Sequence, residues 1–215
     1  MQELSLNEVE LIVKSMADVA IANEKYFSEL DSVAGDADFG VSLATGFRAV
    51  LDKWDTLDHS SISPFLMKVS MVITSNVGGV SGPIWGTGFM KAGITSKDKT
   101  SLTLADLAAM LRAAIEGMMA RGGAQLGDKT LLDAVAPAAD KLEEWSKKEP
   151  QDFLGAFQAA TDAATERIES TRGWMAKRGR QSFLGERSRG SLDPGIVAVA
   201  TMMQAVTKAL NEAQG

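Results

Sequence analysis

The sequence predicts an all-α protein with a single domain over residues 1–215. Apolar residues recur at three- and four-residue spacings along most of the chain, which is the period of a helix with one buried face. Alternating strand patterns and the Asn-Gly or Asp-Gly turns that join strands are not evident. Only five prolines occur, and no Ser- or Pro-rich linker divides the chain. With ordinary helix lengths, this predicts a bundle of about seven or eight helices.

The N-terminal helix begins near Leu6. Ser5 and Glu8 have the spacing of a capping box, in which the two side chains accept hydrogen bonds from the free backbone N–H groups at a helix start. The apolar face of this helix carries Leu6, Val9, Ile12, Val13, Met16, Val19 and Ala20.

Six further helices follow from the same periodicity. Thr103 precedes Asp106 at one helix start, and Asp193 precedes Pro194 at another, which is a cap followed by a first-turn proline. Pro83 can begin one more helix. The six helices are expected over residues 40–54, 63–76, 103–120, 130–147, 152–171 and 194–211.

Glycine is concentrated in four connections between these helices. A purely structural bundle needs only short polar turns, so long glycine-rich connections indicate where function resides. The four connections span residues 35–40, 78–93, 122–127 and 173–195.

Composition excludes several classes of chemistry. The chain has no Cys and a single His, His59, so thiolate zinc sites, iron–sulfur clusters and histidine-rich metal sites are excluded. The net charge of −6 argues against general affinity for nucleic acid or for anionic membranes. The N-terminus lacks a basic leader region, and polar residues interrupt the apolar stretch at 65–80, so a cytoplasmic protein with no membrane span is expected.

Asp31, Asp36 and Asp38 lie close together in the segment LDSVAGDADFG. Carboxylates at this spacing repel one another and usually persist beside a cation, and hard oxygen ligands favour Mg²⁺ or Ca²⁺. An EF-hand is excluded, because counting from Asp36 places Val41 and Phe47 where that motif needs Gly and Glu. Taken alone, the cluster is explained equally well by a helix cap at Asp38 with two solvated acids.

The segment NVGGVSGPIWGTGF, at residues 76–89, follows an apolar helix. Successive backbone N–H groups in such a segment can form an anion-binding concavity, and a helix beginning at Pro83 would direct its N-terminus at a phosphate. The segment matches neither a Walker A loop nor a dinucleotide fingerprint. Close helix packing at small residues is the structural alternative.

The segment RGGAQLGDKTLLD, at residues 121–133, links two helices. Asp128 or Thr130 can cap the second helix, and Asp133 adds negative charge to its first turn. Capping explains much of this segment without a functional role.

A basic segment spans residues 172–189, with six Lys or Arg residues against one acid. Guanidinium groups between glycines suit the binding of polyphosphate. Trp174 and Phe183 raise the alternative of single-stranded nucleic acid, whose bases stack on aromatic rings. A solvated, mobile loop is the structural alternative, but length and glycine spacing favour a lid over a nucleotide. Together, the four segments predict an Mg²⁺-nucleotide protein that acts as a kinase.

The segments GDADFG, GGVSGPIWGTGF, GDKTLLDAVAPA and GRQSFLGERSRGSLDPG, spread over residues 31–195, resemble the nucleotide-binding L subunit of dihydroxyacetone kinase, the DhaL family. The resemblance implies an antiparallel up-and-down barrel of eight helices with the nucleotide bound at one end. It also implies phosphoryl transfer to a short ketose that a histidine of a separate K subunit holds covalently. The donor is ATP in one branch of the family. In another branch it is a phosphotransferase-system protein that rephosphorylates a fixed ADP.

The resemblance also implies the site residues. The metal ligands are expected to be Asp31, Asp36 and Asp38, which would hold two Mg²⁺ ions bridging the phosphates of ADP or ATP. The expected nucleotide contacts are Phe39, Gly40, Val41, Ser42, Val80, Ser81, Gly122, Leu131, Arg180, Asp193, Pro194 and Gly195.

The chain departs from the family pattern within its first motif. The usual GDGDHG is GDADFG here, so that Ala37 replaces Gly and Phe39 replaces His, and Val41 and Ser42 replace a small residue and Asn. The aspartates are intact, so metal binding is still expected. Two alternatives are a non-catalytic nucleotide-binding regulatory subunit and a kinase subunit for another small ketose, such as a tetrulose.

Overall fold

A computed structural model describes residues 3–214. In this part of the chain there are nine α-helices and two 3-10 segments, and no helix combines the length and apolar character that a bilayer crossing requires. The elements are α1 (Leu6–Ala22), α2 (Glu24–Ser32), α3 (Phe39–Asp52), η1 (Trp54–Thr56), α4 (Ile62–Asn76), α5 (Ser81–Thr95), α6 (Leu104–Gly122), α7 (Leu132–Trp145), α8 (Phe153–Ser170), η2 (Arg180–Ser188) and α9 (Pro194–Glu212).

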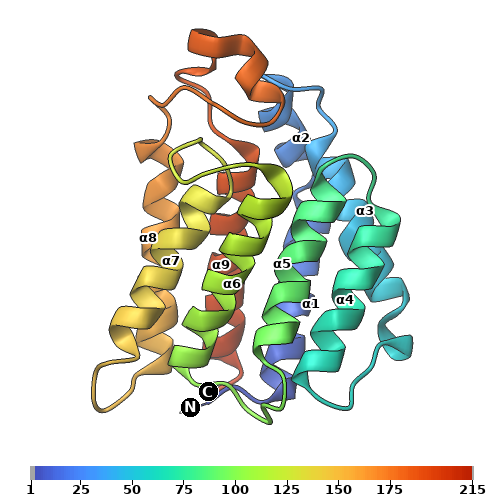
Figure 1. Cartoon of the computed structure of the whole chain (residues 1–215), viewed down its shortest axis with the longest axis vertical. Coiled ribbons are helices and arrows are strands. Elements are labelled where there is room, and N and C mark those ends of the chain that lie inside the picture. Colours follow the sequence, from blue (N-terminus) through green and yellow to red (C-terminus); the bar gives the residue numbers. More distant parts are fainter. Residues whose placement is uncertain (1–2, 215) are drawn as a thin grey trace.

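Eight of the helices form a closed ring. Around the ring, α1 packs against α3, each helix from α3 to α8 packs against the next in sequence, and α9 returns to α1. Neighbouring helices run in opposite directions, and both chain ends lie at the same end of the barrel (Figure 1). The all-α, up-and-down arrangement of about eight helices is therefore confirmed, with α2 as an additional short helix.

Three of the expected helix starts are also confirmed, because their caps form. Ser5 N donates to Glu8 Oε2 at 2.7 Å, and the side chain of Ser5 completes the capping box. Thr103 and Asp106 make the same reciprocal arrangement at the start of α6. Asp193 Oδ1 accepts from Ile196 N at 2.8 Å, ahead of the first-turn proline of α9.

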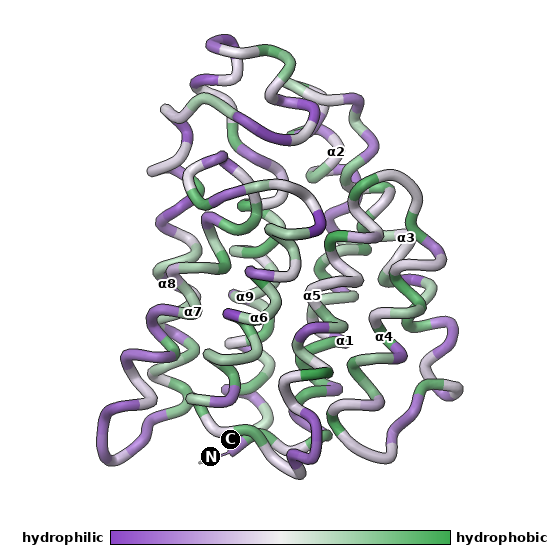
Figure 2. The backbone as a smooth tube through the Cα atoms, viewed as in Figure 1, coloured by the Kyte–Doolittle hydropathy of each residue, from purple (hydrophilic) through white to green (hydrophobic). Residues whose placement is uncertain are grey.

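Apolar side chains line the inside of the ring. Apolar residues follow the barrel helices, whereas the segments at the two ends of the barrel are mainly polar (Figure 2). The large, fully buried residues include Phe47 of α3, Phe65 of α4, Phe153 of α8 and Ile196 of α9. The packing leaves an internal cavity of about 240 Å³, lined almost entirely by apolar atoms. The core therefore consists mainly of contacts between neighbouring helices, and the centre of the barrel is not completely filled.

The structure corrects two of the expected boundaries. The N-terminal helix ends at Ala22, and a separate helix that the periodicity did not predict, α2, follows it and contains Asp31. Residues 81–93 were expected to belong to a glycine-rich connection, but they form most of α5. Pro83 does lie in the first turn of that helix, as expected.

The glycines of α5 allow the helix to pack closely against its neighbours. A Cβ on Gly86 would overlap Thr74 of α4, and a Cβ on Gly88 would overlap Met118 of α6. Gly82 similarly lies against the backbone of Val77. Close packing at small residues, the structural alternative for this segment, is therefore correct for these three positions.

His59 is held by two acceptors between η1 and α4. Its Nδ1 lies 2.6 Å from Glu10 Oε1, and its Nε2 lies 2.8 Å from the backbone oxygen of Trp54. These two contacts raise the pKa of His59 above 6.5, with the Trp54 carbonyl as the larger cause. Protonated His59 therefore stabilises the fold below pH 6.5, and this contribution is lost as the pH rises through the folded-state pKa.

We expect His59→Gln to lower the free energy of unfolding by up to about 1 kcal/mol at pH 6, because the variant loses a partly exposed charged hydrogen bond. At pH 8.5 the loss should be smaller, since the wild-type imidazole is then neutral. Urea denaturation of both proteins at the two pH values measures the difference. Equal losses at the two values would contradict the assignment of the charge to His59.

Candidate functional site

The candidate site residues gather at the barrel end opposite the chain termini (Figure 1). Because neighbouring helices alternate in direction, α3, α5, α7 and α9 all begin at this end. The first turn of a helix has unpaired N–H groups and a partial positive charge. Four such turns around one opening form a surface suited to anions, and phosphates in particular.

The three aspartates meet where α2 passes into α3. Asp31 lies in the last turn of α2 and is buried, whereas Asp36 and Asp38 are exposed in the connection that follows. One carboxylate oxygen from each residue lies within 4.8 Å of those from the other two. Oxygens that share one Mg²⁺ are at most about 4.2 Å apart, because each bond is about 2.1 Å long. A small side-chain rotation would therefore let the three hard donors share a cation.

Asp31 is fixed by the start of α3. Its Oδ2 accepts from the backbone N of Asp38 at 3.1 Å and from that of Phe39 at 3.4 Å. Asp38, at the N-cap position, makes no side-chain cap hydrogen bond. The cap is thus supplied by Asp31 from the neighbouring helix, and the carboxylate of Asp38 is free to bind a ligand.

The electrostatics of the trio also fit a cation. Partial burial, and then repulsion from Asp36 and Asp31, raise the pKa of Asp38, while Arg180 lowers it. Carboxylates in this arrangement lose their mutual repulsion when a cation lies between them. The donor set and its charge therefore fit Mg²⁺, which prefers hard oxygen ligands.

Gly40 holds α2 and α3 close together. A Cβ at this position would overlap the backbone oxygen of Glu24 and the Oγ of Ser28. The absence of a side chain at Gly40 therefore keeps Asp31, on α2, within reach of Asp38, at the start of α3. Phe39 packs edge-on against Phe27, with ring centroids 6.4 Å apart, so the residue that replaces the usual histidine contributes to the apolar core.

Ala37 has a backbone conformation that favours glycine. Its φ is +62°, in the left-handed region that an alanine enters at a cost of roughly 1–2 kcal/mol. This is the position at which the resembling family usually has Gly. The replacement leaves the backbone path unchanged but strains it.

We expect Ala37→Gly to raise the free energy of unfolding by roughly 0.5–1 kcal/mol, because relief of this strain exceeds the added entropy of the unfolded glycine. The exposed Ala109 in the middle of α6 is a matched control. Ala109→Gly should lower stability by a similar amount, since glycine weakens a helix interior. Denaturant unfolding of both variants measures whether the free energy of unfolding rises in Ala37→Gly and falls in Ala109→Gly. A lower free energy of unfolding in Ala37→Gly would contradict the assignment of strain to Ala37.

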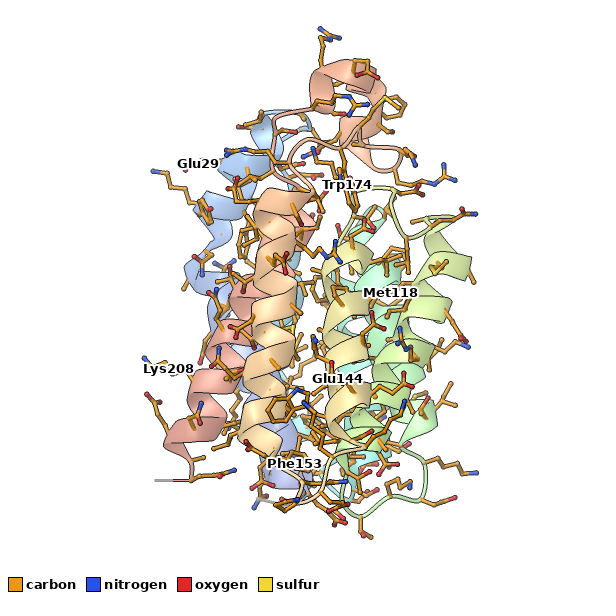
Figure 3. The ribbon with its side chains drawn as sticks, turned by 90° about the vertical axis from the view of Figure 1, so that its left-hand side faces the viewer. Glu29, Met118, Glu144, Phe153, Trp174 and Lys208 are labelled. Atoms are coloured by element: carbon orange, nitrogen blue, oxygen red, sulfur yellow. The ribbon has the colours of Figure 1, made fainter. Side chains whose placement is uncertain are left out.

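The lid, residues 171–192 between α8 and α9, covers this end of the barrel (Figures 1 and 3). Arg180 reaches from the lid to the aspartates, with an Nη2 to Asp36 Oδ2 distance of 2.8 Å. Arg178 Nε donates to the backbone oxygen of Gly123 at 2.8 Å. The lid is therefore a folded segment whose basic side chains contact the acidic cluster and the end of α6.

The other expected nucleotide contacts occupy helix ends around the same opening. Val41 and Ser42 lie in the first turn of α3, Val80 and Ser81 begin α5, Gly122 ends α6, Leu131 precedes α7, and Asp193, Pro194 and Gly195 begin α9. Gly195 packs against Leu131, and Gly122 packs against Ile84 of α5. The start of α9 thus contacts the start of α7, and the end of α6 contacts the start of α5. The roles of these residues in binding stay predictions.

The connection between α6 and α7 differs from expectation. α7 begins at Leu132, and Leu131 rather than Asp128 or Thr130 occupies its N-cap position. The Oγ1 of Thr130 still accepts from Leu132 N at 3.3 Å, so Thr130 does help to cap the helix. Asp133, in its first turn, instead accepts from Gly127 N at 2.6 Å and from Thr130 N at 2.9 Å. These bonds fold the connection back onto the helix start.

Sequence reasoning missed Lys129 in this connection. Its side chain is fully buried, and its Nζ lies near the base of the lid. A single Lys after Gly-Asp has no local pattern that predicts burial, because its partners are far away in the sequence. Burial also raises the pKa of Asp193 to about 7, although the Ile196 N–H and the charge of Lys129 oppose this.

Comparison with known proteins bears on this site. The DAK2 domain family matches residues 33–208. The ADP-binding subunit DhaL of the PEP-dependent dihydroxyacetone kinase of Escherichia coli (strain K12) is 35% identical over 97% of this chain and 100% of its own length. The ADP-binding subunit DhaL of the PTS-dependent dihydroxyacetone kinase of Lactococcus lactis is 32% identical over 85% of this chain and 86% of its own.

Solved structures share the fold. The crystal structure of the dihydroxyacetone kinase from C. freundii in complex with AMP-PNP and Mg²⁺ superposes with a TM-score of 0.72 and 25% identity. The superposition covers 92% of this chain but 33% of that one, so this chain spans about a third of that longer enzyme.

Proposed function

The chain belongs to the DAK2-domain family, and from this premise we propose that it is the nucleotide-binding subunit of a dihydroxyacetone-type kinase. It binds ADP or ATP with Mg²⁺ and acts in phosphoryl transfer to a short ketose. The observation that best supports this is the contact between Arg180 and the carboxylate cluster, at the end where four helices begin. Phosphoryl transfer depends mainly on positioning and on charge neutralisation, and these groups supply both.

Asp31, Asp36 and Asp38 would hold Mg²⁺ through one oxygen each, and we propose that two ions bind. Bound Mg²⁺ would offset the charge of the transferring phosphoryl group. The cap that Asp31 makes with Asp38 N and Phe39 N orients its carboxylate, so that one oxygen stays directed at the start of α3. Arg180 would turn from Asp36 to a phosphate oxygen, which a guanidinium binds in the same planar geometry.

The phosphates would lie over the first turns of α3, at Phe39, Gly40, Val41 and Ser42, and of α5, at Val80 and Ser81. The N–H groups of Phe39 and Ser42 are already paired, with Asp31 and with the backbone oxygen of Asp38. The remaining unpaired N–H groups of these turns can donate to anions without a charged side chain. This explains how the site can tolerate Phe39 in place of histidine. Gly122, Leu131, Asp193, Pro194 and Gly195 would line the rest of the nucleotide pocket.

We propose that a separate K subunit holds the ketose. The sole histidine of this chain, His59, contacts Glu10 and Trp54 just before α4. α4 begins at the barrel end opposite the lid (Figure 1), and no cysteine is present. This chain therefore offers no histidine near the aspartates to retain a sugar covalently. The basic lid and exposed helix starts would face the partner.

Calorimetry with ADP and Mg²⁺ tests the nucleotide site. Wild-type protein should bind, and Asp36→Ala should abolish the Mg²⁺-dependent part of the affinity, since it removes both a metal ligand and the partner of Arg180. Asp162→Ala, at an exposed aspartate of α8, is the matched control and should bind normally. Unchanged affinity in Asp36→Ala would overturn the proposal. With purified K subunit, ATP and dihydroxyacetone, a regulatory subunit would bind nucleotide but form no triose phosphate.

We propose further that the donor is a phosphotransferase-system protein and that ADP stays bound. The supporting observation is that the similar DhaL subunits above are named PEP- or PTS-dependent. Native mass spectrometry of the purified protein should then show retained ADP. An empty site that exchanges ATP freely would favour ATP as the donor.

A further inference from the structure

Lys129 is a fully buried cation between the barrel and the lid. It lies in the connection before α7, with a φ of +63°. Its Nζ donates to the backbone oxygens of Ser188 at 2.8 Å, Trp174 at 3.1 Å and Arg172 at 3.4 Å. The three N–H groups of the ammonium therefore have three carbonyl acceptors, which is the full donor capacity of a lysine.

The three carbonyls belong to the two ends of the lid. Arg172 and Trp174 lie where the chain leaves α8, and Ser188 ends η2 shortly before α9. Figure 3 shows Trp174 at this end of the barrel, opposite Phe153. One side chain from outside the lid thus joins its entry to its exit. Arg180, which contacts Asp36, lies in the segment between these two ends.

Two uncharged hydrogen bonds also join the ends of the lid, from Ala176 N to Ser188 Oγ and from Gly190 N to Arg172 O, both at 2.9 Å. The other contacts that involve a cation are more exposed. Arg172 Nε donates to Gly190 O at 3.1 Å, and an Nη1 of Arg189 donates to Gly173 O at 2.7 Å, but both arginines are exposed. Lys177 and Arg178, also exposed, lie 3.9 and 3.7 Å from Asp128. Exposed ion pairs contribute little to stability. Lys129 is the charged anchor shielded from water.

Burial of the ammonium has a cost that its surroundings must offset. Loss of solvation lowers the pKa of Lys129, and the nearby charge of Asp193 acts in the opposite direction. The carbonyls in contact with Nζ are dipoles that come together only when the lid is folded over the barrel. The closed lid therefore supplies the acceptors that replace water around the buried charge of Lys129.

We propose that Lys129 is a positioning residue that fixes the base of the lid and thereby holds Arg180 over the aspartates. This inference rests on the proposed nucleotide site. Lys129 itself touches no phosphate, because its three donors are used by the lid. Its removal leaves the backbone oxygen of Trp174 without a partner. The oxygens of Arg172 and Ser188 would keep one donor each, Gly190 N and Ser191 Oγ, but would lose the charged one. The base of the lid should therefore open locally while the barrel stays folded.

Limited trypsinolysis tests the anchor without nucleotide. The lid contains six trypsin sites, Arg172, Lys177, Arg178, Arg180, Arg187 and Arg189. Lys129→Met keeps side-chain length without donors, and we expect lid cleavage at least 10-fold faster than in wild type, with thermal unfolding of the barrel still cooperative. Lys97→Met, at an exposed lysine after α5, should cleave at the wild-type rate. Wild-type lid protection in a folded Lys129→Met would overturn the proposal.

A double-mutant cycle tests the action through Arg180. Lys129→Met should weaken Mg²⁺-ADP binding at least 10-fold by calorimetry, whereas Arg187→Met, which removes an exposed lid charge, should weaken it less than 3-fold. Combined with Arg180→Met, Lys129→Met should add less than 2-fold, because its effect passes through the same side chain. Full additivity of the two losses would overturn the proposal.

The two proposals fail in different ways. If wild-type protein binds no nucleotide, the proposed function is wrong, and trypsinolysis still decides whether Lys129 anchors the lid. If Lys129→Met does not fold, Lys129→Gln, which keeps an amide donor, takes its place in both experiments. Lys129→Gln should give intermediate cleavage and intermediate affinity, and wild-type values for both would overturn the inference.

Discussion

Asp31→Asn should reduce Mg²⁺-dependent phosphoryl transfer at least about 100-fold, the loss typical of removing one group that stabilises transition-state charge. The amide keeps the size of the carboxylate but removes the negative charge that a hard cation requires. We expect the loss to appear both in Mg²⁺-ADP affinity, by calorimetry, and in triose phosphate formation in the presence of the K subunit.

The same variant separates metal binding from folding. The side-chain oxygen of the introduced asparagine can still accept from the backbone N–H groups of Asp38 and Phe39, as the Asp31 carboxylate does. Without metal, Asp31→Asn should therefore melt at the wild-type temperature or above it, because the repulsion that Asp31 exerts on Asp38 is reduced. Mg²⁺ should raise the melting temperature of wild type only. A variant that binds Mg²⁺-ADP normally would remove Asp31 from the metal site.

Much of the barrel could be predicted from the sequence because its helices are specified locally. The start of α6 is an example. The side chain of Thr103 accepts from the backbone N–H of Asp106, and the side chain of Asp106 accepts from the backbone N–H of Thr103. The start of α9 at Asp193 is another. In both cases the residues that determine the boundary are adjacent in the sequence, so no knowledge of the fold is needed.

Two features could not be predicted, because tertiary contacts decide them. The end of α1 at Ala22 has no proline or glycine, and α2 departs there to pack on α3 and α9 at the barrel end. In the sequence, the glycines of α5 resemble those of a flexible connection. In the structure, Gly86 and Gly88 lie where α4 and α6 leave no room for a side chain. Glycine in a helix contact and glycine in a loop have the same sequence pattern.

The candidate site was predictable to the extent that its chemistry is clustered in sequence. Asp31, Asp36 and Asp38 are close along the chain and also in space. Lys129 has no such neighbours, since its partners lie 43 to 59 residues away. Short-range motifs therefore indicate the groups that touch ligand, while the residues that hold those groups in place depend on the fold.

Arg180→Met should have opposite effects on metal and on nucleotide. Arg180 forms an ion pair with Asp36 at 2.8 Å, and it therefore competes with a metal cation for this carboxylate. Without Arg180, the binding of free Mn²⁺, measured as a spectroscopic substitute for Mg²⁺, should be unchanged or tighter. Mg²⁺-ADP affinity should fall, and turnover should fall by roughly 10³-fold, as when other phosphoryl-transfer enzymes lose an arginine at the phosphate.

Arg180→Lys distinguishes charge from shape. Lysine keeps the positive charge beside Asp36 but loses the planar pair of donors that matches two phosphate oxygens. We therefore expect Mn²⁺ binding close to wild type and a turnover between those of wild type and Arg180→Met. If both variants weakened metal binding as much as nucleotide binding, Arg180 would act by supporting the aspartates. If only nucleotide binding and turnover fall, the lid arginine acts on the phosphate, and its contact with Asp36 is the state that the nucleotide displaces.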